Sequence, residues 1–544
     1  MPRDNIEMTL KGGQAYLDDM FSMNEDDTND LNGSSEIANF FAGRKVLITG
    51  GSGFLGKLLV EKLLRSCPDI ATLYMFMRTK KGKSPEERFK EHFDDIIFDR
   101  LKQERPYFKD KIVMVQADTS ETDLGLSPES RERLKDTEII FHGAATVRFD
   151  EKLRLAVNIN IRGTKELLLF AKEMPNLKAF VHVSTAFSFC VLKFIEEKFY
   201  DPPMTTDNVL TLMELLNDDQ LTVLTPTLLG EWPNTYAFTK AIAEDTVRQY
   251  SSGIPSCIVR PSIMIATAKE PICGWINNLY GPTGVAVGAA YGILRTLHCQ
   301  KNLVADIIPA DIVINNIIVA AWDTAQKQEI PRSITDANEN KCTTTEEIPI
   351  YNSVSSVQKP VTWGDFMHQN AVNGLEIPSE KVFWYYMLIL NRYKFMHNVC
   401  VVFLHLLPAA VIDTLAYLTG KKPILWNAYK KIHKFSAVIS YFSTQQWRFK
   451  NDAVMSLWER LPPIDKQIFD FNIDDLDWET YYRYYIRGLR LYIAKDPMDT
   501  LDQGRIKYRK LKIAHYSLVT VVCLLVFWGL YTLINFLCTW LLSS

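Results

Sequence analysis

The stretch "RKVLITGGSGFLGKLLVEKLL" at residues 44–64 decides the fold. An apolar run at 46–48 ends in a turn that contains Gly50, Gly53 and Gly56, and a helical pattern follows at once. Glycine allows a tight turn and a close backbone approach to a ligand, and a helix N-terminus attracts phosphate. The pattern therefore predicts a nucleotide site rather than a plain strand–turn–helix with structural glycines.

Composition and charge narrow the classes of protein. The chain has 544 residues, of which 47% are hydrophobic and 23% charged, so it is globular and longer than one ordinary domain. A net charge of −3 predicts no nucleic-acid partner. The nine cysteines are scattered without C-x-x-C or a Cys/His cluster, which predicts reduced thiols and no metal site. No pattern specifies an oligomeric state.

The two ends of the chain differ in character. Residues 1–36 are acidic and lack an apolar signal-peptide core, so we expect a disordered tail. Residues 516–542 hold no charged side chain and follow five basic residues between 505 and 512. This predicts a single transmembrane helix with the larger, N-terminal part of the chain in the cytosol.

A second apolar stretch at 399–418 is ambiguous. It contains His405, Pro408 and Asp413, and a charge near the centre of a membrane span is costly. We therefore favour a buried or interfacial helix over a true span.

Strand and helix patterns alternate after the glycine turn. Apolar strand patterns recur at 72–78, 112–118, 139–145 and 178–188, with an amphipathic helix at 153–174. This alternation predicts an α/β fold, a Rossmann-type doubly wound parallel sheet, in which ligands bind at the C-terminal ends of the strands. We expect a nucleotide-binding reductase domain at 37–350, a mostly helical domain at 351–500, and then the transmembrane helix.

The end of the second strand indicates the cofactor. Arg78 closes that strand without an acidic neighbour, and three lysines follow it at 80, 81 and 83. A cation at this position suits the 2′-phosphate of NADPH, whereas an acid suits the free ribose of NADH. The alternative is a solvated basic loop.

A catalytic group is expected from "NTYAFTKAIAED". Tyr236 and Lys240 stand four apart and share one helix face, where the ammonium would lower the pKa of the phenol. Ser184 or Thr185, at the end of the strand pattern 178–188, would bind a substrate carbonyl oxygen. The alternative is an ordinary helix surface with a solvated lysine, but the order of the motifs favours an oxidoreductase.

The segments "VLITGGSGFLGKLLVEKLL", "HGAATVRFDE" (142–151), "VHVSTAFS", "WPNTYAFTKAIAE" (232–244) and "IVRPSI" (258–263) carry a family resemblance. They resemble the alcohol-forming fatty acyl-CoA reductases, insect-type members in particular, a membrane-bound branch of the extended short-chain dehydrogenases/reductases. The resemblance continues through 351–366 to 481–497. Position 143 is Gly where relatives often carry Cys, which keeps a small residue there.

The resemblance implies roles for particular residues. Thr185 is the implied hydroxyl partner of Tyr236 and Lys240, with Ser184 in reserve. The implied contacts with NADPH are the phosphates at Gly50, Ser52, Gly53, Phe54, Leu55 and Gly56, the 2′-phosphate at Arg78, the adenine near Asp118, and the nicotinamide end near Ala144, Tyr236 and Lys240.

The chemistry implied is the reduction of a long- or very-long-chain acyl-CoA by two hydrides from NADPH. A hemithioacetal expels CoA-SH to give an aldehyde, which becomes a primary alcohol without a nucleophilic cysteine. We expect contact with membrane lipid, with the endoplasmic reticulum favoured over the peroxisome, and an acyl groove built from 377–408 and from 188–232, the latter including an insertion (190–232) over the active site. A membrane-bound sterol- or sugar-type dehydrogenase and a silent lipid-binding protein are the alternatives.

Overall fold

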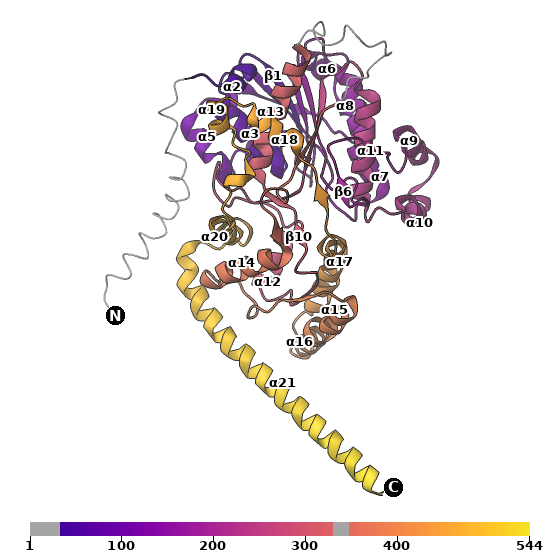
Figure 1. Ribbon diagram of the computed structural model, residues 1–544, viewed down its shortest axis with the longest axis vertical. Coiled ribbons are helices and arrows are strands. Elements are labelled where there is room, and N and C mark those ends of the chain that lie inside the picture. The colour runs from indigo at the N-terminus through magenta and orange to yellow at the C-terminus, as the bar shows by residue number, and fades with distance from the viewer. Residues whose placement is uncertain (1–32, 330–347, 544) are drawn as a thin grey trace, which may run out of the picture.

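The computed structural model describes residues 33–329 and 348–543, so most of the acidic tail predicted at 1–36 lies outside the described residues. A seven-stranded, wholly parallel sheet lies at the centre of the N-terminal part (Figure 1). Its strands, in spatial order, are β12 (Ile350–Ser353), β7 (Ser256–Pro261), β5 (Ala179–Val183), β4 (Ile139–His142), β1 (Lys45–Thr49), β2 (Thr72–Met77) and β3 (Ile112–Gln116).

The order of the strands places the ligand crevice. The chain moves outward from β1 through β2 to β3, and then returns to the other side of β1 with β4. Val46 of β1 lies opposite Leu73 on one side and Ile139 on the other. Ligands of such sheets bind beyond the C-terminal strand ends where the order reverses, which here is between β1 and β4. The predicted Rossmann-type fold class is confirmed.

Helices cover both faces of the sheet. The helix α3 (Phe54–Ser66) and the long helix α13 (Ala310–Glu329) pack together on one face, and α8 (Gly163–Ala171) and α11 (Thr235–Tyr250) on the other. The shorter elements are α2 (Glu36–Phe41), α4 (Pro85–His92), η1 (Ile96–Phe98), α5 (Asp99–Glu104), η2 (Phe108–Lys111), η3 (Thr122–Gly125), α6 (Pro128–Leu134), α7 (Leu153–Val157) and the π-helix η4 (Asn158–Arg162).

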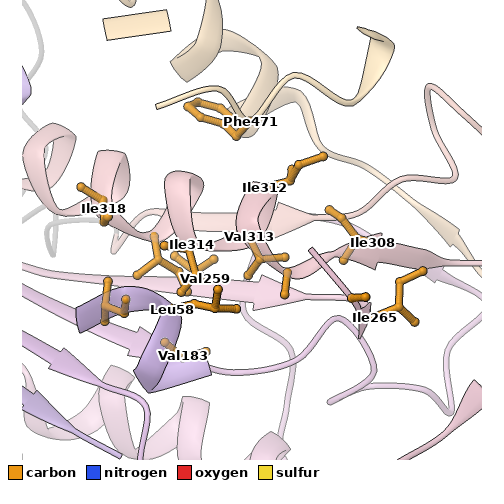
Figure 2. Close-up of a cluster of buried hydrophobic side chains, with 14 of the residues drawn as sticks. Leu58, Val183, Val259, Ile265, Ile308, Ile312, Val313, Ile314, Ile318 and Phe471 are labelled. Carbon is orange, nitrogen blue, oxygen red and sulfur yellow. The ribbon is translucent and has the colours of Figure 1, made fainter. Parts of the chain in front are cut away.

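The core on the α13 face joins distant parts of the chain. Figure 2 shows Val313 and Ile314 of α13 close to Val259 of β7, with Leu58 of α3 beside them. Phe471, from the far end of the sequence, covers the outer side of α13 in the same apolar cluster. All of these side chains except Phe471 are at least 98% buried, and Phe471 is 4% exposed, so this face has little space left for solvent.

The C-terminal part is mostly helical and interleaved with the sheet. Strand β12 crosses the boundary predicted at 350, and α18 (Asp452–Glu459) packs against it. The division into two domains remains a prediction. The other helices of this part are α12 (Pro282–Ala290), α14 (Trp363–Glu376), α15 (Lys394–Val401), η5 (Val402–Leu406), α16 (Leu407–Leu418), α17 (Leu425–Ser443), α19 (Pro463–Ile468), η6 (Ile473–Asp475), α20 (Trp478–Gly488), η7 (Leu489–Ile493), η8 (Met498–Thr500) and α21 (Leu501–Ser543).

Short strand pairs outside the main sheet join segments that are distant in the sequence. They are β11 (Ile307–Pro309) with β8 (Ile263–Ile265), β10 (Val304–Ala305) with β13 (Val361–Thr362), β14 (Ile389–Asn391) with β9 (Thr296–His298), and β15 (Arg448–Phe449) with β6 (Phe194–Ile195).

The segment 190–232 takes a different place from the one expected. Its helices α9 (Thr206–Leu215) and α10 (Asp218–Leu229) lie at the flank of the molecule, where they bury Val209 and Leu221 against α7 and α11 (Figure 1). Their apolar residues therefore complete a side cluster and not a roof over the strand ends. Only the ends of the segment, with Tyr200 and Trp232, reach the aromatic cluster described below.

Two apolar helices stand out by their exposure. The helix over 498–542, which includes α21, contains an 18-residue apolar window, and 0% of that window is buried. It leaves the body at one end of the molecule (Figure 1). Only 11% of the apolar window in the helix over 394–418 is buried, so the buried alternative for 399–418 is wrong, and the interfacial helix and the true span remain.

Candidate active site

The turn after β1 has no room for side chains. Gly50 has φ +77°, and a Cβ there would lie 2.7 Å from the backbone nitrogen of Ala144. A Cβ on Gly56 would lie 2.2 Å from the carbonyl oxygen of Gly50. Glycine is therefore required at both positions, for the left-handed backbone at one and for close packing of helix on turn at the other.

The first turn of α3 is open toward the crevice. Gly53 occupies the N-cap position, and no side chain caps the helix there. By contrast, Asn234 caps α11 through the nitrogen of Ala237 at 2.8 Å. The free N–H groups of Phe54 and Leu55, together with the helix dipole, make this terminus a suitable place for a phosphate. The residues of the turn thus fit a dinucleotide.

Three cations gather beside the turn. Arg78 Nη1 lies 3.1 Å from Asp118 Oδ2, which brings two predicted site residues together. Arg88, which the sequence analysis did not single out, donates to Ser52 Oγ at 2.9 Å and to the carbonyl of Arg78. Burial and the charge of Arg78 both lower the pKa of Arg88, and the same two causes lower the pKa of Lys80. Cations that disfavour one another in this way suit a doubly charged anion.

The loop after β4 is held against the turn. The nitrogen of Ala144 donates to Thr49 Oγ1 at 3.2 Å, which holds the loop after β4 against the end of β1. Asn160, a second residue that the sequence analysis missed, accepts from the nitrogen of Thr146 at 2.9 Å and donates to Thr239 at 2.9 Å. Asn160 therefore joins this loop to α11, the helix that carries Tyr236.

Tyr236 and Thr185 meet at the C-terminal end of β5. The hydroxyl of Thr185 lies near the phenol of Tyr236, whose pKa it lowers, and it donates to the carbonyl oxygen of Pro261 at 3.4 Å. Burial raises the pKa of Tyr236 to about 12, and the neighbouring hydroxyl of Thr185 only partly opposes this rise. This is the opposite of the lowering expected from Lys240. The phenol consequently stays protonated at neutral pH and is available as a hydrogen-bond donor.

Lys240 is directed at the strand end. Its Nζ donates to the carbonyl oxygen of Val183 at 2.8 Å, and its side chain is buried. Burial lowers the pKa of Lys240 to about 8, against the opposing charge of Glu244. The amine is therefore held near the expected nicotinamide end and titrates close to physiological pH.

Ser184 has a different environment from Thr185. Its hydroxyl donates to Glu244 Oε1 at 2.5 Å, and Glu244 also pairs with the fully buried Arg260 at 2.6 Å. Ser188 donates to the same carboxylate at 2.9 Å. Ser184 thus belongs to a buried polar network under α11, and Thr185 is the hydroxyl that contacts Tyr236.

Aromatic rings line the space next to Tyr236. Phe149 stacks on Tyr236 with ring centroids 5.7 Å apart, and Phe442 of α17 contacts Phe149 at 5.6 Å. Phe187 and Trp447 extend this wall. The C-terminal part of the chain therefore supplies one side of the site, which the short motifs of the N-terminal part do not reveal.

Cys190 lies in the same apolar cluster but is chemically quiet. Burial raises the pKa of its thiol to about 12, so no thiolate forms there at neutral pH. The arrangement supports direct hydride attack on a carbonyl, with the Thr185 and Tyr236 hydroxyls polarising its oxygen.

Comparisons with known proteins agree with this geometry. A family model described as Male sterility protein, of the NAD-binding kind, matches residues 48–317, and a second model with the same description matches 404–496. Fatty acyl-CoA reductase wat of Drosophila melanogaster is 39% identical over 530 residues, which cover 97% of this chain and 98% of that protein. Fatty acyl-CoA reductase 1 of Homo sapiens is 36% identical over 491 residues, 90% of this chain and 92% of that one.

Solved structures share the fold. The reductase (R) domain of nonribosomal peptide synthetase from Mycobacterium tuberculosis has a TM-score of 0.51 at 17% identity, covering 87% of this chain and 98% of that chain. The terminal R domain from the myxalamid PKS-NRPS biosynthetic pathway has a TM-score of 0.50, also at 17% identity, with 87% and 97% covered. These two concern the fold alone.

The fold and the site define an oxidoreductase with a Rossmann-type NAD(P)-binding domain. The similarity to the curated relatives extends over nearly the full length and identifies the kind of oxidoreductase. The chain belongs to the fatty acyl-CoA reductase family. The predicted family resemblance is confirmed.

Proposed function

We propose that this protein reduces a long-chain fatty acyl-CoA to the primary alcohol with two molecules of NADPH. The observation that carries the proposal is the placement of the Thr185 hydroxyl beside the phenol of Tyr236, with Lys240 bound to the end of the same strand. The balanced reaction consumes one thioester, two NADPH and two protons, and yields one alcohol, one CoA-SH and two NADP⁺.

The chain's own residues orient the carbonyl and supply its proton. NADPH supplies the hydride when bound. Thr185 and Tyr236 donate hydrogen bonds to the carbonyl oxygen, and the phenol proton neutralises the oxyanion that forms. Lys240 holds the ribose beside the nicotinamide. Expulsion of CoA-SH after the first reduction leaves an aldehyde on the same two hydroxyls, which then serve the second reduction.

Preference for NADPH follows from the cations beside the turn. Arg78 and Arg88 both reach the edge of the crevice where the adenosine ribose of such cofactors lies, next to Ser52 and Asp118. A 2′-phosphate would relieve the mutual repulsion of these cations, and a free hydroxyl would not. Two arginines with fixed geometry therefore support NADPH over NADH.

The acyl tail requires an apolar path, and α14 provides one. Trp363, at the start of α14, lines a small cavity together with Phe187 and Phe442. Farther along the same helix, Met367 and Leu375 line a second cavity. That cavity is enclosed mainly by apolar side chains of α12, α14, the segment 377–386, η7 and the first turns of α21. We place the tail along α14, with the thioester at Tyr236.

This path uses one of the two segments expected from the sequence. Ile377, Pro378, Val382 and Tyr386, from the segment 377–408, contribute to the second cavity. In the described part of the chain, the residues that line either cavity include Phe187 but none from 188–232.

Membrane attachment fits a substrate of low water solubility. We propose that α21 inserts into the bilayer over 516–542, with the catalytic part in the cytosol and the endoplasmic reticulum as the favoured membrane. The exposure of the apolar helix supports this, because such a surface is unfavourable in water.

The test of the activity uses the full chain in lipid vesicles with NADPH and hexadecanoyl-CoA. We expect hexadecanol and a ratio of two NADPH oxidised per alcohol formed. Oxidation of a sterol or sugar alcohol in the absence of any alcohol product from acyl-CoA would instead indicate the alternative dehydrogenase. Tyr236→Phe separates catalysis from binding, because it removes only the transferable proton and should leave NADPH binding intact.

The test of the tail path uses the space beside Gly374. A Cβ built on Gly374 meets nothing within 4 Å, and this residue lines the second cavity. Gly374→Leu should therefore shift the alcohols made toward shorter chains. Val372→Phe, on the 44% exposed side of the same helix, is the matched control and should leave the chain-length profile unchanged.

A further inference from the structure

We propose that the helix over 394–418 lies in the plane of the membrane, half embedded in the bilayer that receives α21. We call its outward side the apolar face. It consists of side chains spaced mostly four residues apart, each at least half exposed: Phe395, Phe403, Leu407, Val411, Leu415 and Leu418. Residues with this spacing share one side of a helix, and a stripe of this kind is unfavourable against water.

The polar residues of the same stretch are satisfied by the protein. His405 is fully buried, and its Nε2 accepts from the backbone nitrogen of Arg295 at 2.9 Å. Its other ring nitrogen lies 3.1 Å from Nε2 of His433 on α17. Asp413 accepts from three backbone nitrogens at the start of α17, at 2.8 to 3.1 Å. Neither group therefore has to face lipid, which removes the objection to membrane contact that the sequence raised.

Two features of the apolar face indicate that it contacts a lipid surface: its position near α21 and the lysines that flank it. Helices α15 and α16 stand at the end of the body past which α21 extends (Figure 1). Exposed lysines of the following loop and of α17 flank the face, which suits anionic headgroups: Lys421, Lys422, Lys430 and Lys431.

The arrangement excludes a true span, although 25 residues are long enough for one. Helix α17 packs along α16 and is tied to His405 and Asp413. The far end of α17 holds Phe442 in the aromatic cluster beside Tyr236. Helix α16 could not cross the bilayer without drawing α17 and its lysines in with it. A helix that lies in the membrane plane keeps the contacts of α17 with both His405 and Asp413.

The first experiment is site-specific photocrosslinking of the full chain in sealed vesicles of phosphatidylcholine and phosphatidylserine. A benzophenone amino acid replaces Phe403, Leu415 or, as a matched control, Val223 of α10, which is also exposed, at 77%. NADPH-dependent activity shows that each variant is folded. We expect lipid adducts at 403 and 415 at least tenfold above those at 223. Adducts to a second copy of the chain, or lipid adducts no more frequent than at 223, would overturn the proposal.

The second experiment separates an in-plane helix from a span. A membrane-impermeant amine reagent is added to the same vesicles, with the catalytic part outside. Labelling of Lys421 and Lys422 without detergent supports the in-plane helix, and labelling only after detergent overturns it in favour of a span. The proposal rests on insertion of α21. If α21 did not insert, a benzophenone amino acid in place of Phe527 would form no lipid adduct, so that failure is recognised separately.

Discussion

The hydroxyl of Ser184 donates to the buried carboxylate of Glu244 at 2.5 Å, and this bond turns Ser184 away from Tyr236. The next hydroxyl in the chain, that of Thr185, is the one that lies near the phenol and lowers its pKa. Two adjacent hydroxyls at the same strand end therefore have different tasks. Ser184 supports the helix that carries Tyr236 and Lys240, and we expect Thr185 to face the substrate.

This difference predicts opposite effects for two similar substitutions. Thr185→Val keeps the shape but removes the donor, so we expect kcat to fall by at least about a hundredfold while NADPH binding is unchanged. Ser184→Ala should lower the free energy of unfolding by about 1–3 kcal/mol and retain most of the turnover. Steady-state kinetics and thermal unfolding of the two variants, in parallel, check this. Greater loss of turnover in Ser184→Ala would reverse the assignment.

Cofactor preference should depend on Arg78 and Arg88 together. Losing one charge-assisted contact costs about 1.5–3 kcal/mol, so Arg78→Ala or Arg88→Ala should weaken NADPH binding roughly 10- to 150-fold. NADH, which lacks the 2′-phosphate, should be affected much less. Titration with both nucleotides measures the ratio, and Arg133→Ala, at a solvent-exposed arginine on α6, is the control. An equal loss of affinity for both nucleotides would show that Arg78 and Arg88 do not bind the 2′-phosphate.

Activity should decline at alkaline pH because of Lys240. Burial lowers its pKa to about 8, so the ammonium is present below that pH and is lost as the pH rises through it. We expect kcat/KM for NADPH to fall roughly tenfold per pH unit above about pH 8. In Lys240→Arg, which stays charged, this limb should disappear even though the overall rate is lower. A profile of the native protein that stays flat to about pH 10 contradicts this account.

The pair Glu244–Arg260 should be the costliest ion pair to break. The side chains are 0% (Arg260) and 1% (Glu244) exposed, so Glu244→Gln leaves a buried guanidinium without its counter-charge. The expected loss is about 3–5 kcal/mol of unfolding free energy. Glu129→Gln breaks the exposed pair with Arg133 and should cost less than about 1 kcal/mol. Thermal unfolding in detergent compares the two, and similar losses would show that burial is not what makes the first pair important.

Much of the fold could be predicted because buried parallel strands read as continuous apolar runs. The runs at 46–48, 72–78 and 112–118 became β1, β2 and β3 with bounds that differ by only a few residues. The glycine turn was recognisable for a similar reason, since Gly50 and Gly56 are required by local geometry that any sequence must satisfy.

What could not be predicted depends on contacts between distant residues. Arg88 reaches Ser52 only because α4 folds back over the end of β2, and nothing in the spacing of the two residues shows it. Phe442 joins the site from a helix nearly 200 residues beyond Tyr236. For 399–418, the amino-acid composition is equally typical of a buried core helix and of a helix on a membrane surface. Only the exposure of the assembled helix separates them.

The π-helix η4 has a consequence for the length of its segment. An α-helix turns by about 100° per residue, and one extra residue in a π turn rotates everything before it by that angle relative to everything after it. Here the rotation lets Leu153 and Val157 face α9 and α10 while Leu167 and Leu168 face the sheet. The number of residues in η4 therefore sets the angle between the faces of α7 and α8. Removing any one residue between 158 and 162 would turn one of these faces outward and swing Asn160 off Thr239, whereas most substitutions there would preserve both.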